Sequence, residues 1–414
     1  MVTVTHADDA HDCHMSGEAG MRILRSRRAV VALSTAGLLF VAACGGGDDG
    51  GGTGGGGGGG SEGANLPEVI NFVSINPETG PAAFAGLSAE DGFKLAVKEI
   101  NEQGFLGENT TIEVEYKDTK GQIPTAASEL STAIANPSVA AVYGSVSSQE
   151  AVAQSPLAQQ AGLPIIYTQA GSEGVVIGDA TYRATPLMSS YYPALQEYVD
   201  ENGWETVGVI YAPTPTLEEV AKESIPGLGL EVVAEVGTTP TTQDFSAAIS
   251  QVLDADPDVV SLLLVGAANP TAMTQLRQAG YDGPVLGNAG ASAGNLSPAG
   301  EDGAGMVWAT DFHPAQEVES SQAFVEAYNE EYGEDPLNYA AEGYDAAWFL
   351  ARAIKEAGSA ERADIIEGMA AVAAEPWTGA LGEDLTWEDG TIQVAGAAVE
   401  WTGTESQLLY AAEG

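Results

Sequence analysis

The sequence predicts an α/β protein made of two doubly wound lobes, each a parallel sheet with helices on both faces. Three observations lead to this fold class. The chain has 414 residues, enough for two or three domains that each bury a core. Its hydrophobic fraction is 44%, which excludes wholesale disorder despite a formal charge of −45. From about residue 65 onward, short β-branched runs alternate with amphipathic helical stretches, a pattern typical of parallel sheets joined by helices.

The N-terminal region has the pattern of a signal peptide. Four arginines between residues 22 and 28 precede an apolar run, residues 29–43, which is too short to anchor stably across a bilayer. The run ends Val41-Ala42-Ala43-Cys44, and this ending resembles the lipobox of bacterial lipoproteins. The resemblance implies cleavage before Cys44 and acylation of that cysteine, which would anchor the protein to the cell membrane. An ordinary secretory signal with an incidental cysteine is the alternative.

Residues 1–20 precede the usual start of a signal peptide, because Met21 stands directly before the basic region. They are either an extension removed with the signal (residues 1–43) or the result of a start at Met1 instead of Met21. Histidines and a cysteine gather there with metal-like spacing: His6, His11, Cys13 and His14. Since the mature protein would lack them, we expect no metal site and no disulfide, with Cys44 the only remaining cysteine.

A glycine-rich segment, residues 44–64, follows the cleavage site. Glycine occupies 14 of the 19 positions from Gly45 to Gly63, a composition that behaves as a flexible coil with a reach of about 24 Å. No strand precedes it and no Gly-Lys-Ser/Thr follows, so it does not match a phosphate loop. We expect a tether between the membrane and the folded body.

The first lobe begins with a strand at Val69–Ser74 and a helix at Ser88–Gln103, whose Phe93, Val97 and Ile100 share one face. The alternation then predicts strands at Thr111–Lys117, Ala140–Tyr143 and Pro164–Tyr167, and helices at Ile123–Ala135 and Gln149–Gln160.

A second series of the same kind predicts the second lobe. Its expected strands are Thr206–Tyr211, Glu231–Val236, Val259–Val265 and Pro284–Leu286, and its expected helices are Thr216–Ser224, Phe245–Leu253 and Thr271–Ala279. Three later helices must then pack on one of the two lobes: Ser320–Tyr332, Tyr339–Glu356 and Glu361–Ala373.

Several segments resemble, in order, the leucine/isoleucine/valine-binding protein family, the type I periplasmic solute-binding proteins of ABC importers. The resemblance covers nearly all of residues 67–402 and includes "EVINFVSINPETGPAAFAGLSAEDGFKLAVKEINEQGFLG", "VAAVYGSVSSQEAVAQSPLAQQAGLPII", "YRATP", "TTQDFSAAISQVLDADPDVV", "PTAMTQLRQAGYDGPVLG" and "EGYDAAWFLARAI". It implies two lobes that close like a clamshell, joined by crossovers near 183–186, 310–314 and 385–396. Lobe I would comprise residues 65–185 and 312–385, and lobe II residues 186–311 and 386–414.

The expected ligand site lies at the carboxyl ends of the strands, where helix N-termini present free N–H groups. The best candidate is the loop Gly144–Ser148. Ser147 and Glu150 have capping-box spacing, which would satisfy the helix end without a ligand. The two interpretations are compatible, and by resemblance Ser148 holds the carboxylate of the ligand.

A second candidate is Gln169-Ala170-Gly171-Ser172. The resemblance implies that a backbone carbonyl and a hydroxyl here receive the amino and carboxylate groups of the ligand. Gly171 falls where the hydroxyl is usual, and Ser172 comes one position later. A plain Gly-Ser turn is the alternative. Tyr344, which matches a family tyrosine, is expected to line the cleft, although a tyrosine on an amphipathic helix is more often part of the core.

The expected site departs from the amino-acid binders of the family. The stretch Gly287-Asn288-Ala289-Gly290 has no acid to pair an ammonium, and Thr216, Ala268 and Ala289 stand where bulkier or charged groups are usual. Phe84 is expected to cover the ligand, and Asp345 is a weak substitute for the missing acid. Because a buried, unpaired ammonium costs several kcal/mol, we expect a small carboxylate or amide-like solute without a free α-amino group.

The composition excludes other functions. With 14 Lys and Arg against 59 Asp and Glu, nucleic acid is not an expected partner. The mature chain would retain only His313 and no free thiol, so it lacks the groups of an enzyme, and no cofactor is expected. The prediction is a monomeric, extracytoplasmic, lipid-anchored binding protein that delivers a branched-chain amino acid-like carboxylate or amide to ABC permease subunits. A ligand-binding sensory subunit acting on a separate membrane receptor is the alternative.

Overall fold

The computed structural model describes residues 66–80, 82–239 and 241–411. The expected signal peptide, Cys44 and the expected glycine-rich tether lie outside these residues. Within them, no helix combines the length and apolar character needed to cross a membrane.

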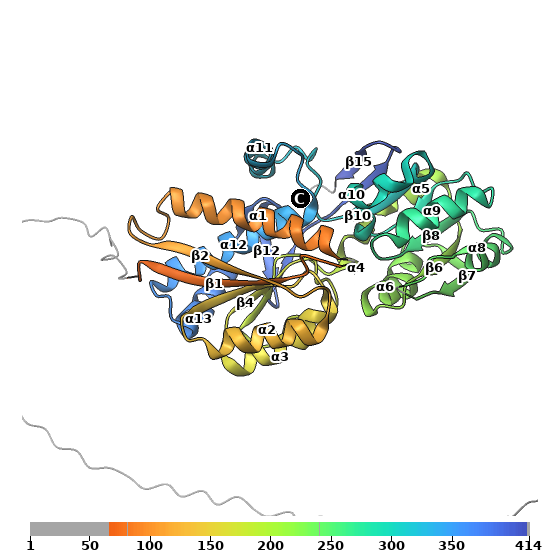
Figure 1. The fold of residues 1–414 in the computed structure, drawn as a ribbon. Helices are drawn as coiled ribbons and strands as arrows, with labels where there is room; N and C mark the ends of the chain where they lie inside the picture. The colour runs from red at the N-terminus through yellow and green to blue at the C-terminus, as the bar shows by residue number, and fades with distance from the viewer. Residues whose placement is uncertain (1–65, 81, 240, 412–414) are drawn as a thin grey trace, which may run out of the picture. The chain divides into compact units, whose positions relative to one another are not determined.

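Lobe I is built on an eight-stranded sheet with the order β11-β12-β13-β5-β4-β3-β1-β2 (Figure 1). Its strands are β1 (Val69–Asn76), β2 (Thr111–Asp118), β3 (Val139–Gly144), β4 (Ile165–Tyr167), β5 (Thr181–Arg183), β11 (Trp377–Gly379), β12 (Gly382–Glu388) and β13 (Thr391–Gln393). The five strands from β1 to β5 run parallel, as the sequence predicts, and β11, β12 and β13 add antiparallel pairings at one edge. The sheet is therefore mixed.

Helices cover both faces of this sheet (Figure 1). They are α1 (Ala83–Glu102), α2 (Ile123–Ala135), α3 (Ser148–Ala161), α11 (Glu319–Tyr332), α12 (Asn338–Ala357) and α13 (Arg362–Ala373). One buried cluster joins α1, α12 and α13 to the sheet, and a separate cluster lies under α2 and α3. The three late helices thus belong to lobe I.

Lobe II is built on a seven-stranded sheet with the order β15-β14-β10-β9-β8-β6-β7. Its strands are β6 (Thr206–Tyr211), β7 (Glu231–Gly237), β8 (Val259–Leu263), β9 (Val285–Leu286), β10 (Met306–Thr310), β14 (Ala397–Trp401) and β15 (Ser406–Ala411). Strands β6 to β10 are parallel, and β14 and β15 pair antiparallel. One continuous apolar core lies between this sheet and its helices.

The helices of lobe II are shorter than those of lobe I. They are α4 (Met188–Tyr191), η1 (Tyr192–Leu195), α5 (Gln196–Asn202), α6 (Pro215–Glu219), η2 (Val220–Ser224), α7 (Ile225–Gly227), α8 (Ser246–Leu253), α9 (Ala268–Gln278), η3 (Ala289–Ala291), α10 (Ala293–Leu296) and η4 (Ser297–Gly303).

The chain passes between the two sheets three times: after β5, after β10 and after β13. The third crossover falls inside the predicted segment 385–396, but lobe I extends past its predicted boundary at residue 385. The chain turns at Asp389-Gly390, both with positive φ, and returns as β13 to pair with β5. Lobe I therefore continues to Gln393, because this hairpin completes its sheet.

Helices α1 and α12 approach each other closely at two glycines. A Cβ on Gly92 would collide with the carbonyl of Ala340, and one on Gly343 would collide with the carbonyl of Ala89. Because both obstacles are backbone atoms, they cannot move aside as a flexible side chain could. The two glycines thus set the distance between the helices that carry much of the lobe I core.

Gly343→Ala is expected to lower the free energy of unfolding by about 1–3 kcal/mol or more, since the added methyl group must push α1 and α12 apart. Gly227→Ala is the control, because that glycine is helical with open space around its Cβ position. Urea denaturation monitored by circular dichroism measures both. Equal stabilities of the two variants would contradict the close-packing argument.

Candidate functional site

Loops from both lobes come together at the carboxyl ends of the parallel strands. In lobe I, the loops after β1, β3 and β4 share one edge because these strands are parallel neighbours. In lobe II, the loops after β6, β8 and β9 do the same. The two edges meet where the Tyr339 hydroxyl donates a hydrogen bond to the Ala289 carbonyl at 3.0 Å. The expected ligand residues, apart from Tyr344, lie on these loops or in the first turns of the helices that follow them.

Ser148 lies at the N-terminus of α3 and is half-buried, so its hydroxyl is placed at the edge of lobe I. Its Oγ accepts a hydrogen bond from the Ser172 amide at 3.3 Å, which links the two candidate loops. The expected capping box is wrong: the Ser147 side chain makes no cap hydrogen bond. Glu150 instead accepts from the buried Ser145 hydroxyl at 2.6 Å, and it is therefore not available to the N-cap.

A buried polar chain supports the Ser145–Ser148 loop from behind. The Val146 amide donates to Asn76 Oδ1 at 3.1 Å, and Asn76 Nδ2 donates to Ser74 at 3.2 Å. The Ser74 hydroxyl in turn donates to Glu90 at 2.9 Å. Burial raises the pKa of Glu90 to about 7, although the Ser74 hydrogen bond and Lys94 at 3.5 Å oppose the shift.

Arg183 holds the second loop. Its Nη1 donates to the carbonyls of Ala170 at 2.9 Å and Ser172 at 2.8 Å, and its Nη2 donates to Thr391 at 3.0 Å. Burial lowers the pKa of this guanidinium to about 10, so it stays charged. Within the described residues, it forms no ion pair within 4.0 Å. A buried cation thus lies directly behind the Gln169–Ser172 loop, and Glu219 of α6 is the opposite charge that acts on it.

The lobe II residues form a small, uncharged surface. Thr216 lies in the first turn of α6, Ala268 begins α9, and Ala289 begins η3. Asn288 is committed to the backbone: it accepts from the Gly290 amide at 2.8 Å and donates to the Leu264 carbonyl at 3.1 Å. These side chains bring no charge to the site.

Tyr344 does not join this group. Its hydroxyl donates to Glu99, and its ring packs on Phe324 at 4.9 Å, on the α1 and α11 side of lobe I. The structure instead places Tyr339 at the lobe contact, with its ring 5.6 Å from that of Phe84. Tyr339 and Tyr344 are five positions apart on α12 and therefore face different neighbours. The sequence does not show which of the two faces lobe II, and Tyr339 was missed for this reason. Its place in the first turn of α12 was the available signal.

Asp345 is also remote from the proposed ligand. Its carboxylate accepts from the Ala380 amide at 2.7 Å, the Leu381 amide at 3.1 Å and the Trp377 indole at 3.2 Å. Burial raises the pKa of Asp345 to about 6 despite these donors. It fixes the turn after β11 and cannot serve as the ammonium partner considered from the sequence.

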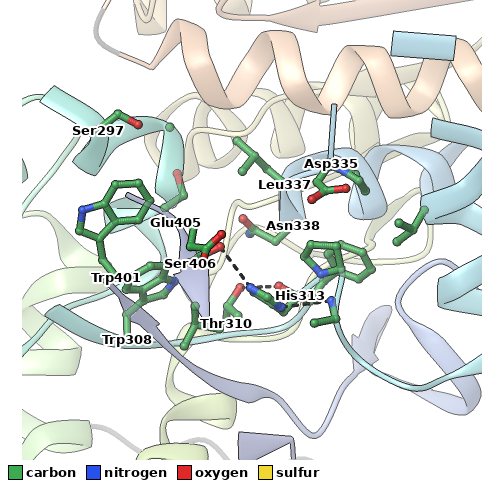
Figure 2. A pocket seen from close by; sticks show the side chains of 18 of the residues that line it. Ser297, Trp308, Thr310, His313, Asp335, Leu337, Asn338, Trp401, Glu405 and Ser406 are labelled. Atoms are coloured by element: carbon green, nitrogen blue, oxygen red, sulfur yellow. Dashed lines mark hydrogen bonds between the residues drawn. The ribbon is translucent and has the colours of Figure 1, made fainter. Parts of the chain in front are cut away.

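A cavity of about 490 Å³ lies beside the second crossover (Figure 2). Its lining includes Trp308, Trp401 and His313, and it shares no residue with the expected ligand site. His313 Nε2 lies 3.1 Å from the Ser406 hydroxyl, and Nδ1 accepts from the Ala315 amide at 3.2 Å. Burial lowers the pKa of His313 to about 4, so the ring is neutral near pH 7. Across the described part of the chain, no group of three or more His, Cys, Asp and Glu is arranged to hold a metal.

The chain belongs to the periplasmic binding protein family, whose pattern it matches over residues 69–406. Members are non-enzymatic, extracytoplasmic solute receptors of ABC transporters, and the two-lobe fold is that of the Leu/Ile/Val-binding, type I class. Leu/Ile/Val-binding protein homolog 7 of Brucella abortus is 27% identical over 340 residues, covering 76% of this chain and 84% of that protein. The leucine-, isoleucine-, valine-, threonine- and alanine-binding protein of Pseudomonas aeruginosa is 23% identical over 327 residues, with 77% and 86% covered.

Solved structures have the same fold. The leucine-binding protein LivK of Thermotoga maritima has a TM-score of 0.74 at 25% identity, covering 82% of this chain and 98% of that one. An R. palustris solute-binding protein in complex with benzoate has a TM-score of 0.74 at 21% identity, with 82% and 95% covered. The observed α/β architecture with two lobes therefore confirms the predicted fold class.

Glu90 generates a pH-dependent prediction. Its pKa in the folded state lies above the value of 4.5 for a free side chain, so the stability it contributes is present at low pH and is lost as pH rises through about 7. The full loss is about 3 kcal/mol. Glu90→Gln should therefore destabilise less at pH 8.5 than at pH 5, as measured by urea denaturation. The exposed Glu113→Gln serves as the control, and a pH profile of Glu90→Gln identical to wild type would refute the assignment.

Proposed function

We propose that this chain is a membrane-tethered receptor that delivers a small carboxylate or amide-like solute, without a free α-amino group, to an ABC importer by clamshell closure. The observation that carries the proposal is an asymmetry between the lobes. Lobe I offers hydrogen-bond donors and a buried cation, whereas the lobe II loop Gly287–Gly290 contains no acid.

The lobe I side suits an anion. The N-terminus of α3 presents backbone N–H groups and the positive end of the helix dipole, and the Ser148 hydroxyl is beside them. The Arg183 guanidinium lies behind the backbone of the Gln169–Ser172 loop, because it donates to the carbonyls of Ala170 and Ser172. A carboxylate bound in front of this loop gains from both features.

An ammonium has no equally good place. The Ala170 carbonyl, which the family resemblance assigns to the amino group, already accepts from Arg183 at 2.9 Å, so an ammonium there would lie near a like charge. The loop Gly287–Gly290 contributes no carboxylate, and Asn288 is engaged with the backbone. Burying an unpaired ammonium costs several kcal/mol.

The apolar part of the solute would contact aromatic rings. Phe84 and Tyr339 meet edge to face at the junction of the lobes, and the lobe II residues expected in the site, Ala268 and Ala289, have small side chains. Structures of proteins with the same fold contain isoleucine or benzoate, and each of these small molecules has an apolar part and one carboxylate. Benzoate and the deaminated analogue of leucine are therefore suitable probes.

Titration calorimetry of the purified protein tests the ligand class. Benzoate or 4-methyl-2-oxopentanoate is expected to bind more tightly than leucine, because neither brings an ammonium into a site without an acid. Leucine, isoleucine and valine are measured in parallel at the same pH. Tighter binding of leucine than of its deaminated analogue would overturn the ligand class and leave the family assignment intact.

Ser148→Ala is expected to weaken binding of whichever carboxylate binds by roughly 10- to 150-fold, since it removes one hydrogen bond to a charged group worth about 1.5–3 kcal/mol. Ser147→Ala is a matched control, because the neighbouring hydroxyl makes no cap hydrogen bond. Equal dissociation constants for Ser148→Ala and wild type would show that Ser148 only braces the Ser172 amide.

Tethering is tested in cells with labelled palmitate. Cys44→Ala should abolish lipid incorporation and release the protein from the membrane fraction, because acylation requires that thiol. Cys13→Ala is the control and should retain the label, since residue 13 would be removed with the signal peptide. Equal labelling of wild type and Cys44→Ala would disprove the lipid anchor.

A further inference from the structure

Two buried acids face each other where the chain crosses between the lobes. Asp311 directly follows β10 in the second crossover, and Glu342 lies in α12 of lobe I; their exposed fractions are 1% and 0%. Both carboxyl groups lie within hydrogen-bond distance of one side-chain amide nitrogen. The Asn338 amide nitrogen lies 3.1 Å from Glu342 Oε1 and 3.4 Å from Asp311 Oδ1, so it bridges the pair.

The partners of the pair are neutral. Asp311 accepts from the Thr185 hydroxyl at 3.3 Å and the Thr310 hydroxyl at 3.5 Å, and Glu342 accepts from the Gln169 amide. The titratable groups that act on the pair from packed elements are the phenols of Tyr143 on β3, Tyr191 on α4 and Tyr339 on α12.

No cation compensates the two acids. Burial raises the pKa of all three phenols, so these rings stay neutral. His313, two residues along the crossover, is directed to Ser406 and Ala315 and is also neutral at pH 7. Within the described residues, no Lys or Arg lies within 4.0 Å of either carboxylate.

Two ionised carboxylates accept hydrogen bonds and cannot donate one to each other. Two adjacent negative charges bridged by one neutral amide in a buried site would repel strongly, and a proton on one of the two carboxyl groups removes that repulsion and allows a hydrogen bond between them. We propose that Asp311 and Glu342 share one proton, and that through this proton Glu342 acts as a positioning residue for the ligand-facing loop Gln169–Ser172.

The pair connects four parts of the chain. Thr185 belongs to the first crossover, Asp311 to the second, Glu342 to α12 of lobe I, and Gln169 to the ligand-facing loop. Gln169 has a φ of 50°, an uncommon left-handed conformation for a non-glycine residue, and its amide and side chain are held by Glu342 and Asn338 respectively. Loss of the shared proton would place two charges at this junction, draw in water and release the loop.

Burial raises the pKa of both acids, and for Glu342 the nearby charge of Asp311 adds to the shift. Because these pKa values are raised in the folded state, folding takes up a proton at neutral pH. The stability of the junction therefore falls as pH rises. The consequence for ligand affinity rests on the proposed function, whereas the proton itself does not depend on any ligand.

Proton uptake on refolding tests the pair in the full chain. Refolding at pH 7 is followed by calorimetry in buffers with different ionisation enthalpies, without ligand. Wild type should bind about one proton more than Glu342→Gln or Asp311→Asn, because an amide can donate to the remaining carboxylate with no proton shared. The exposed Glu330→Gln is the control and should match wild type. Equal proton uptake by wild type and both amide variants overturns the proposal. Binding of a sodium ion to the two acids in place of the shared proton would overturn it as well.

Hydrogen exchange of the wild-type protein gives a second measurement, which stands even if one amide variant does not fold. The Gln169 amide should lose protection between pH 6 and pH 9, relative to the core amides of β3, and the Glu342→Gln or Asp311→Asn variant that folds should not show this loss. Constant relative protection in wild type would show that the pair is merely structural. Because neither measurement uses a ligand, its failure is distinct from a failure of benzoate or the leucine analogue to bind.

Discussion

Much of the arrangement of lobe I, at its edge nearest lobe II, depends on the hydrogen bonds that the Arg183 guanidinium donates. It stands at the end of β5, where the first crossover starts, and it donates to two carbonyls of the Gln169–Ser172 loop. Its third contact is Thr391 of β13, shortly before the third crossover. A single buried cation therefore fixes the Gln169–Ser172 loop relative to two of the three connections, and under the proposed function its charge favours an anionic ligand group at that loop.

The electrostatic setting of the junction is unusual for so acidic a chain. Asp and Glu outnumber Lys and Arg by 59 to 14. Ion pairs such as Lys98–Glu331, Lys117–Glu115 and Lys222–Glu218 lie on the surface. Within the described residues, the acids near the crossovers have no basic partner within 4.0 Å. Neutral donors, namely amides and hydroxyls, satisfy them instead. Such acids keep a proton because burial without a cation disfavours the charged form. Among the described residues, no ion pair within 4.0 Å therefore lies at this junction.

The sequence predicted long, periodic elements well. The bounds of α2 and β6 agree with the expected ranges, because each is a complete amphipathic or β-branched run. Short elements were missed: β5 and β13 have three residues each, too few for a periodic signal, and their pairing with each other joins residues far apart in the sequence. The same limit set the predicted end of lobe I at residue 385, short of Gln393.

The candidate site was predictable in its loops but not in its side-chain partners. The loops after β3 and β4 were found because parallel strands end at one edge. The capping box failed because the alternative partner of Glu150, Ser145, lies in the preceding turn and no spacing rule ranks the two. Tyr344 was chosen over Tyr339 because the pattern of a helix does not say which neighbour each face meets.

The acid pair and the proposed ligand class have one physical cause in common. A receptor of this fold must close around its solute and open again, so contacts between the lobes must be strong enough to select the solute and weak enough to break. The cross-lobe contact between Tyr339 and Ala289 is a neutral hydrogen bond, worth about 0.5–1.5 kcal/mol. A fixed acid on lobe II facing Arg183 at close range would add a stronger attraction that holds the lobes together without solute. The Gly287–Gly290 loop contributes no such acid, and Glu219 of α6 acts on Arg183 without an ion pair within 4.0 Å among the described residues. Under the proposed function, the carboxylate of the solute adds a close negative charge when the lobes close.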